Sequence, residues 1–145
     1  MLELALEEIL THDLSVKKSF LGVHARDELP RILKYPSCLI LNTKPRLHPG
    51  EHWLAIFWNT HGHCEFFDSY GKHPNTYNLL DYIKQNSTSW EINKQRIQGT
   101  SAYCGHYCIL FLLFRARNKV TKFYQKFTKN FAENDKIITK LLNDF

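Results

Sequence analysis

The segment Trp53–Trp58, WLAIFW, is apolar at every position and constrains the fold more than any other part of the chain. A strand with one solvated face alternates apolar and polar residues, whereas a strand covered on both faces is apolar throughout. The turn-forming loop Asn59–His63 follows, and Cys64–Phe67 is typical of the strand that returns from it. The sequence therefore predicts a β-hairpin whose first strand is central in a sheet.

Helical and strand patterns on either side of this hairpin predict the rest of the fold. Apolar residues at helical spacing open the chain, and this helix is expected to end near residues 12–13. Gly22, Pro30 and Pro36 predict an irregular region, and residues 44–51 are expected to form an exposed connection. The other expected elements are strands over 37–43 and 90–97 and helices over 77–85, 102–118 and 121–145, the last broken near 133–135. This order predicts an α+β fold in a single domain that spans residues 1–145.

The composition is that of a globular protein, with 43% hydrophobic and 23% charged residues. The first ten residues contain three glutamates where a signal peptide would be basic, and the longest apolar run, 108–114, is too short to cross a bilayer. We therefore expect a soluble protein that is not secreted and does not enter membranes. The net charge of +5 gives a mild attraction to polyanions such as DNA, but no nucleic-acid-binding motif is present.

Four cysteines, at positions 38, 64, 104 and 108, are expected to be reduced thiols, because no export signal precedes them. Cys104 stands out because it falls in QGTSAYCGHYC, where a polar, glycine-containing loop turns into an apolar helix. The positive end of a helix favours thiolate over thiol. Cys104 is therefore a candidate nucleophile, and Gly105 is expected to leave room for a substrate backbone. The alternative is that Cys104 is a small buried core residue.

A nucleophilic thiol needs a base, and the base needs a group that orients it. Pairing residues outward from the turn at 59–63 places His52 opposite a position within about two residues of Asp68. Both side chains then lie at the same end of the hairpin, where Asp68 can bind one imidazole nitrogen and leave the other for the thiol. Taken singly, His52 would be a surface histidine and Asp68 a turn-forming cap. Their pairing favours the catalytic interpretation.

Gln98 precedes the loop that leads to Cys104. A side-chain amide at this position can donate a hydrogen bond to the oxyanion of a tetrahedral intermediate, together with the backbone N–H of Cys104.

Three stretches, GEHWLAIFW, FFDSYG and QGTSAYCGHYC, together resemble the adenovirus protease (adenain) family, whose fold is shared with the SUMO-specific proteases. That clan has His–Trp, then Asp or Glu, then Gln, then Cys along the chain. Here the same order is supplied by His52–Trp53, Asp68, Gln98 and Cys104. The upstream segments SFLGVHARDELP and CLILNT also resemble the adenoviral protease, so the resemblance covers residues 19–114.

The resemblance implies a papain-like fold, with a central mixed sheet flanked by helices, and a cysteine endopeptidase that requires no metal or other cofactor. Cys104 would attack the scissile carbonyl while His52 protonates the leaving amine. Asp68 would orient His52, and Gln98 would bind the oxyanion. The expected substrate-binding residues flank His52 in the sequence: Gly50, Glu51 and Trp53.

The resemblance further implies cleavage after small residues such as Gly, in structural precursor proteins of a DNA virus or virus-like mobile element. It implies a monomer in the virion and in the host nucleus or cytoplasm, with an activating peptide or DNA as further partners. The alternative within the clan is a protease of ubiquitin-like proteins, since Asp68 matches the SUMO-specific branch whereas adenoviral enzymes have Glu. Residues 90–97 contain no cysteine, so the disulfide-linked activation of the adenoviral enzymes is not expected.

A zinc-binding module is the alternative from another class of protein. The fragments HxHC and CxHxxxC offer six candidate ligands: His61, His63, Cys64, Cys104, His106 and Cys108. HxHC is not an established zinc-ligand spacing, and Cys108 falls in a helix that is predicted to be buried. A catalytically inactive binding module and an acyltransferase on the same fold are further alternatives. The complete residue set argues against the first, and no acyl-donor site supports the second.

Overall fold

The computed structural model describes residues 3–44, 52–93 and 95–145, and its core is one mixed sheet. The five strands lie in the spatial order β1-β2-β3-β4-β5. Their bounds are Phe20–Ala25 (β1), Ser37–Asn42 (β2), Trp53–Trp58 (β3), His63–Phe67 (β4) and Ser89–Ile92 (β5). Strand β3 pairs antiparallel with β2 and β4, while β1 and β5 are parallel to their neighbours. The central position of β3 confirms the prediction from its apolar sequence.

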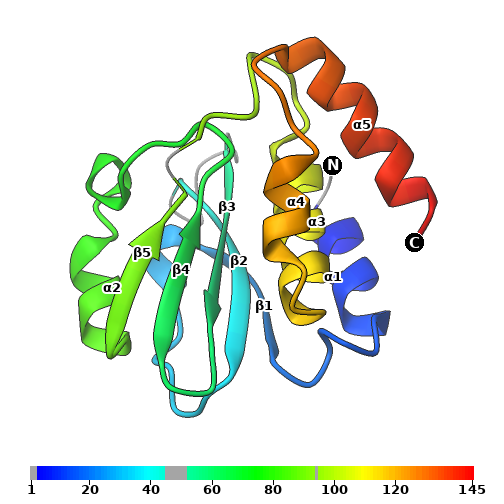
Figure 1. The fold of residues 1–145 in the computed structure, drawn as a ribbon. Helices are drawn as coiled ribbons and strands as arrows, with labels where there is room; N and C mark the ends of the chain where they lie inside the picture. The colour runs from blue at the N-terminus through cyan, green and yellow to red at the C-terminus, as the bar shows by residue number, and fades with distance from the viewer. Residues whose placement is uncertain (1–2, 45–51, 94) are drawn as a thin grey trace.

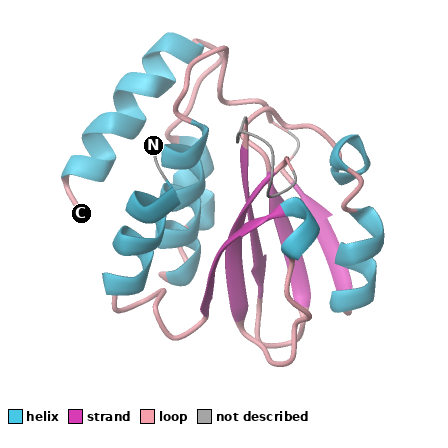
Figure 2. Ribbon diagram, turned by 180° about the vertical axis from the view of Figure 1, so that it is seen from behind, coloured by secondary structure: helices cyan, strands magenta, loops and turns pink. Residues whose placement is uncertain are grey.

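Helices cover both faces of this sheet (Figures 1 and 2). Their bounds are Glu3–His12 (α1), Leu80–Asn86 (α2), Cys104–Ala116 (α3), Val120–Gln125 (α4) and Phe131–Asn143 (α5). Helices α1, α3, α4 and α5 lie on one side, and α2 lies on the other. The structure is therefore an α+β fold with a mixed sheet between helices, as predicted. None of the helices in the described part of the chain is both long and apolar enough to span a bilayer.

Strand β3 is apolar throughout because each of its faces packs against a different set of helices. Ala55 and Phe57 belong to the core cluster that contains α3, whereas Leu54 and Ile56 belong to the cluster that contains Ile83 of α2. Helix α3 is buried from its first residue through position 114, except at position 106. Because both faces of β3 are covered, its side chains contribute alternately to two hydrophobic cores.

Two segments differ from the prediction: one forms a strand where an irregular region was expected, and the other is a shorter strand than expected. Residues 20–25 form β1 rather than an irregular region, because they pair with β2, and Gly22 adopts a φ of +99° inside the strand. The pairing of β1 with β2 shifts register between Phe20 and Val23, as in a β-bulge, and a glycine accommodates this conformation without strain. Strand β5 ends at Ile92, so the predicted strand over 90–97 was too long.

The helical predictions were correct in type and less accurate in their bounds. Residues 74–77 form a 3₁₀ turn, and α2 begins only at Leu80. The C-terminal region breaks at 126–130, between α4 and α5, and not near 133–135. Asn130 caps α5 there, accepting a hydrogen bond from the Glu133 N–H at 3.1 Å. The connection predicted over 44–51 lies outside the described residues except for Lys44.

Candidate active site

His52 lies directly before β3 and Asp68 directly after β4, so the hairpin carries both residues at one end of the sheet. Ala55 pairs with Phe67 in this hairpin, and continuing the register by three residues brings Tyr70 opposite His52, two positions from Asp68. His52 Nε2 lies 2.7 Å from Asp68 Oδ1, and the two residues are 6% and 0% exposed. The structure thus brings together the two residues that the hairpin pairing predicts as neighbours.

Among the residues that the structure describes, three donors besides His52 hold the Asp68 carboxylate. The Tyr77 hydroxyl donates to Oδ2 at 2.5 Å, the Tyr70 N–H donates to Oδ1 at 2.9 Å, and the Lys72 N–H donates to Oδ2 at 3.3 Å. Burial by itself raises the pKa of this carboxyl, but hydrogen bonds from His52 and Tyr77 outweigh burial and lower it. Asp68 is therefore an ionised and rigidly held partner for the imidazole.

Cys104 is the first residue of α3, is 6% exposed, and interacts with the His52 imidazole. Burial raises the pKa of its thiol, but the interaction with the His52 imidazole and the hydrogen bonds with the backbone of Trp53 and Gly105 outweigh burial and lower the pKa. Burial likewise lowers the pKa of His52, but its hydrogen bond with Asp68 and its interaction with Cys104 raise that pKa to about 9. These opposite shifts favour a thiolate–imidazolium pair.

The hydrogen bond of one His52 ring nitrogen to Asp68 indicates which nitrogen is left for the thiol. Nε2 is bound to Asp68, whereas the buried Nδ1 makes no hydrogen bond with any residue that the structure describes. Nδ1 is therefore the atom that can exchange a proton with Cys104.

The four cysteines, all within the described residues, are free and buried, but their environments differ. Burial raises the pKa of Cys38 and of Cys64 to about 12. Burial also raises the pKa of Cys108 well above its usual value. Cys104 is thus the one cysteine of the four whose surroundings favour the thiolate.

Gln98 is fully buried, between Ser69 and the loop that leads to Cys104. Its Nε2 donates to the Ser101 carbonyl oxygen at 2.9 Å and to Ser101 Oγ at 3.2 Å, and its Oε1 accepts a hydrogen bond from the Ser69 hydroxyl. The amide therefore lies in the expected loop, with its N–H groups engaged by that loop. Donation to an oxyanion requires the exchange of one of these two hydrogen bonds.

The residues expected to bind substrate have different positions. Gly50 and Glu51 lie outside the described residues. Trp53 is half-buried at the start of β3 and packs against the core that contains α3. A Cβ on Gly105 would lie 3.1 Å from Leu6 Cδ2 and 3.5 Å from Trp53 Cδ1. The absence of a side chain at Gly105 therefore leaves room for Leu6 of α1 and for Trp53, and the room for a substrate backbone stays a prediction.

Tyr70 belongs to the site although its residue type carries no signal for it. Its ring stacks on the His52 imidazole, with centroids 4.1 Å apart and planes inclined by 8°. The signal that could have found it is the hairpin register, which places it opposite His52. Both rings border a pocket of about 300 Å³, lined by Arg26, Thr43, Lys44, His52, Tyr70, Lys72, Thr76, Tyr77 and Asn78.

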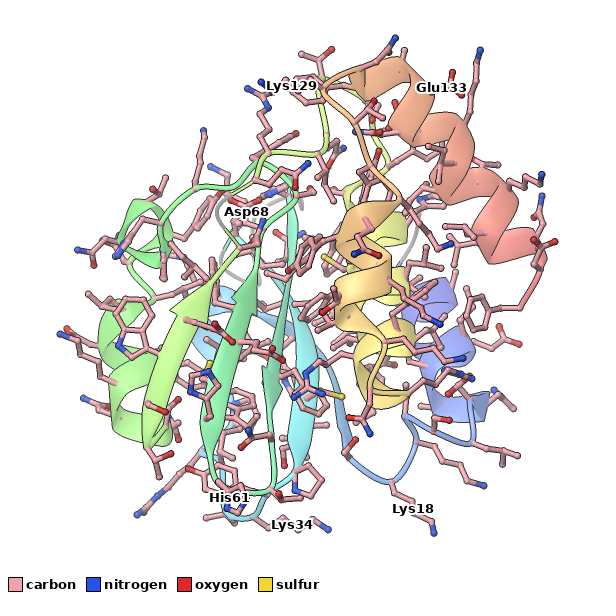
Figure 3. All side chains as sticks on the ribbon, viewed as in Figure 1. Lys18, Lys34, His61, Asp68, Lys129 and Glu133 are labelled. Atoms are coloured by element: carbon pink, nitrogen blue, oxygen red, sulfur yellow. The ribbon has the colours of Figure 1, made fainter. Side chains whose placement is uncertain are left out.

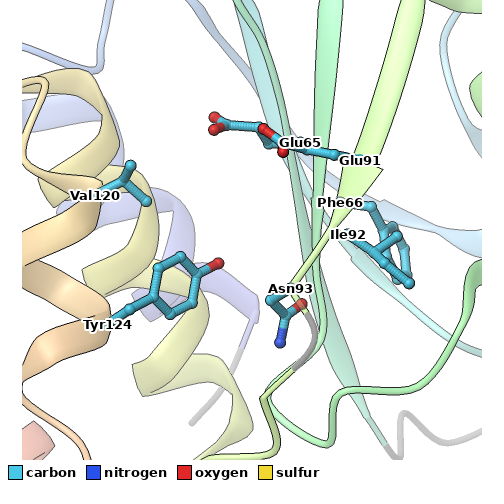
Figure 4. Close-up of a pocket in the computed structure, with 7 residues that line it drawn as sticks. All are labelled: Glu65, Phe66, Glu91, Ile92, Asn93, Val120 and Tyr124. Carbon is cyan, nitrogen blue, oxygen red and sulfur yellow. The ribbon is translucent and has the colours of Figure 1, made fainter.

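A second pocket, of about 220 Å³, lies between the β4–β5 edge of the sheet and α4 (Figure 4). It is lined by Glu65, Phe66, Glu91, Ile92, Asn93, Val120 and Tyr124. Asn93 links this pocket to the site, because its Oδ1 accepts from the Asp68 N–H at 2.9 Å and its Nδ2 donates to the Asp68 carbonyl oxygen at 2.7 Å. Asn93 thus holds the backbone that carries the carboxylate.

The six histidines and cysteines of the zinc alternative are not gathered into one site. Figure 3 shows His61 and Asp68 at opposite ends of β4. His63 Nδ1 and Nε2 contact Ser89 and Glu91 at 2.6 and 3.2 Å. Among residues 3–44, 52–93 and 95–145, no group of three or more His, Cys, Asp or Glu side chains has a metal-binding arrangement.

Comparisons with known proteins agree with the geometry. The chain is 34% identical over 111 residues to the protease of human adenovirus A serotype 12, a match that covers 66% of this chain and 50% of that protein. It is 33% identical over 121 residues to the protease of bovine adenovirus B serotype 3, covering 71% of this chain and 59% of that protein. The chain therefore spans only about half to three-fifths of the length of these relatives.

The fold is similar to that of ChlaDub1 from Chlamydia trachomatis. The TM-score is 0.52, with 15% sequence identity, over 75% of this chain and 58% of that one. This similarity supports the predicted fold. The sequence profile of the adenovirus endoprotease family matches residues 20–140. Since this match covers most of the chain, the protein belongs to the adenovirus endoprotease family.

Proposed function

We propose that the chain is a cysteine endopeptidase in which Cys104 is the nucleophile and His52 the acid–base catalyst. The observation that carries the proposal is the buried His52 imidazole, which Asp68 binds at 2.7 Å through Nε2 and whose free Nδ1 is left for the Cys104 thiol at the start of α3. A helix N-terminus, a buried imidazole and an ionised carboxylate supply the three conditions that an activated thiol needs. The viral proteases among its relatives support the same chemistry.

In the first half of the proposed reaction, the Cys104 sulfur attacks the scissile carbonyl carbon, and the carbonyl oxygen becomes an oxyanion. The Cys104 N–H and, after exchange of a hydrogen bond, the Gln98 amide donate to this oxyanion. The His52 imidazolium then gives its Nδ1 proton to the leaving nitrogen, the C–N bond breaks, and a thioester remains.

In the second half, His52 takes a proton from water, and the resulting hydroxide attacks the thioester carbon. The C–S bond breaks, the carboxylic acid product leaves, and the thiolate–imidazolium pair is restored. Asp68 keeps Nδ1 directed at the sulfur throughout, because it binds Nε2.

We further propose that the enzyme cleaves after small residues such as Gly, and that its substrates are structural precursor proteins of a DNA virus or virus-like element. The family membership and its adenoviral relatives support this substrate class. Its site of action would be the virion and the host nucleus or cytoplasm. The proposed chemistry requires no metal or other cofactor. DNA or a peptide is proposed as an activator, with the net charge of +5 supporting the former.

The test is to incubate the chain with a diverse peptide library, alone and with added DNA, and to sequence the new termini. We expect cuts after Gly that disappear in Cys104→Ala and persist in Cys64→Ala, which removes a buried thiol on the other core cluster. Cutting that continues at the same rate in Cys104→Ala would contradict the proposed nucleophile.

A protease of ubiquitin-like proteins is the second candidate, favoured by Asp68 at the position where adenoviral enzymes have Glu. A folded ubiquitin-like protein fused through its C-terminal Gly–Gly to a reporter distinguishes the two candidates. Cleavage of this fusion much faster than of the library peptide would favour the second candidate.

A further inference from the structure

Helix α5 contacts the loop before Cys104 through one carboxylate oxygen, Asp135 Oδ1. The Ser101 hydroxyl donates to this oxygen at 3.1 Å, and the Tyr107 hydroxyl donates to it at 2.8 Å. Ser101 belongs to the loop that joins Gln98 to α3, and Tyr107 lies in α3, three residues after Cys104. A single acceptor therefore ties the loop to the helix that carries the nucleophile.

The same contact reaches the Gln98 amide. Gln98 Nε2 donates to both Ser101 oxygens, at 2.9 Å for the carbonyl and 3.2 Å for the hydroxyl. Ser101 is thus bound on one side by Gln98 and on the other by Asp135. The position of the amide relative to Cys104 depends on where Ser101 is held.

Other residues of α5 reinforce this attachment. Asn134, fully buried, donates from Nδ2 to the Ile97 carbonyl oxygen at 2.9 Å, directly before Gln98. Phe131 packs on Gly99, where a Cβ would approach the Phe131 Cβ to 3.2 Å. The backbone over 97–101 is therefore clamped by the first two turns of α5. Among these contacts, Asp135 is the one that acts on a side chain bound directly to the Gln98 amide.

We propose that Asp135 is a positioning residue that, through Ser101, holds the Gln98 amide where it can bind the oxyanion. The inference rests on the proposed function and deepens it. Oxyanion donors act only when they are held where negative charge develops, and a displacement of about 1 Å can cost a hundredfold in rate. An ionised carboxylate accepts two hydroxyl hydrogen bonds at one oxygen more strongly than a neutral acceptor does.

The proposal predicts that loss of Asp135 affects the reactions of Cys104 that form an oxyanion and not the others. Alkylation of Cys104 by iodoacetamide forms no oxyanion and depends only on the thiolate. Hydrolysis places an oxygen in the oxyanion position. Inhibition by a peptide aldehyde does the same, because the Cys104 sulfur adds to the aldehyde carbonyl carbon. Loss of Asp135 should therefore slow hydrolysis and weaken aldehyde inhibition, and it should leave the alkylation of Cys104 unchanged.

The experiment measures hydrolysis, aldehyde inhibition, alkylation and the melting temperature in the full chain. The substrate is a fluorogenic amide of a peptide selected from the library, and the inhibitor is the aldehyde of the same peptide. In Asp135→Ala we expect kcat to fall about tenfold to a hundredfold with KM changed less than about twofold. Aldehyde inhibition should weaken by a similar factor, and the alkylation rate should stay as in the wild type. Ser101→Ala should lower kcat in the same direction.

Two variants separate positioning from stability. Asp135→Asn keeps an oxygen that accepts both hydroxyl bonds, so it should recover most of the lost kcat. Glu133→Ala removes the same charge from an exposed position of α5 and should retain the wild-type kcat. If Asp135→Ala does not fold, Ser101→Ala and Asp135→Asn still decide the question.

The inference is overturned if Asp135→Ala and Ser101→Ala keep the wild-type kcat while their melting temperature falls. It is also overturned if alkylation and hydrolysis fall in parallel. A wild-type chain that cleaves no peptide overturns the proposed function as well, whereas normal turnover with an insensitive Asp135 overturns this inference alone.

Discussion

The imidazole of His52 lies parallel to the phenol ring of Tyr70, with centroids 4.1 Å apart. The β3–β4 register creates this pair, because it brings the residue after Ser69 opposite the residue before β3. The stack fixes the plane of the imidazole, and the hydrogen bond to Asp68 fixes its rotation within that plane. Together they hold the ring in one orientation and leave the buried Nδ1 without a hydrogen-bond partner among the described residues.

Removal of the stacked Tyr70 ring should lower the rate of hydrolysis without abolishing it. Stacked aromatic pairs contribute about 0.5–1.5 kcal/mol, so Tyr70→Ala should reduce kcat about twofold to twelvefold. Tyr70→Phe keeps the ring and should retain most of the wild-type kcat. Steady-state kinetics of the three proteins on one peptide tests this, and a wild-type kcat in Tyr70→Ala would contradict an orienting role.

The pH dependence of hydrolysis should be bell-shaped, with its upper limb set by His52. The pKa of His52 is raised to about 9, so the imidazolium is present below that pH and is lost as the pH rises through it. The lower limb lies where Cys104, whose pKa is lowered, becomes protonated. A plot of kcat/KM against pH measures both limbs.

Replacement of the orienting carboxylate should move the upper limb of that profile. In Asp68→Asn the imidazolium loses its charged partner, so the upper limb should shift to lower pH and the rate should fall about a hundredfold or more. Asp81→Asn, an exposed change on α2, is the matched control and should keep the wild-type profile. An unchanged upper limb in Asp68→Asn would show that Asp68 does not set the His52 pKa.

The thiols should differ in reactivity as their surroundings differ. Iodoacetamide near neutral pH should modify Cys104 well before the other three cysteines, because burial raises the pKa of Cys38, Cys64 and Cys108. His52→Ala should abolish this preference, since it removes the partner of the thiolate. Peptide mapping by mass spectrometry reads out each site, and equal labelling of all four thiols in the native protein would rule out an activated nucleophile.

The stability of the site should depend on the packing of α3 against the sheet. Phe111 is 1% exposed and stacks on Phe67 of β4 with centroids 4.7 Å apart. Phe111→Ala should lower the free energy of unfolding by about 3–5 kcal/mol. Phe145→Ala, at a position that is 54% exposed, should cost less than about 1 kcal/mol. Denaturant titrations give both values, and equal costs would contradict a core role for Phe111.

Local patterns were enough to predict the part of the site that lies within one hairpin. Strand β3 and helix α3 are recognisable because their apolar residues follow the period of buried elements. The turn at 59–63 is short, so counting residues outward from it relates His52 to Asp68 without knowledge of the rest of the fold. The geometry of Cys104 at a helix start is likewise a property of one continuous segment.

Tertiary structure alone decided the features that join distant segments. Strand β1 forms despite Gly22 because β2, beyond a loop, supplies a parallel partner. Ser101 and Asp135 are 34 residues apart, yet they share a hydrogen bond that no periodicity predicts. A repeat in the sequence reports which face of an element is buried, whereas the partner of a polar side chain is known only once whole elements have packed. For this reason local patterns were enough to identify a candidate nucleophile, base and carboxylate, whereas the contacts that hold them in place follow from the packing of the whole chain.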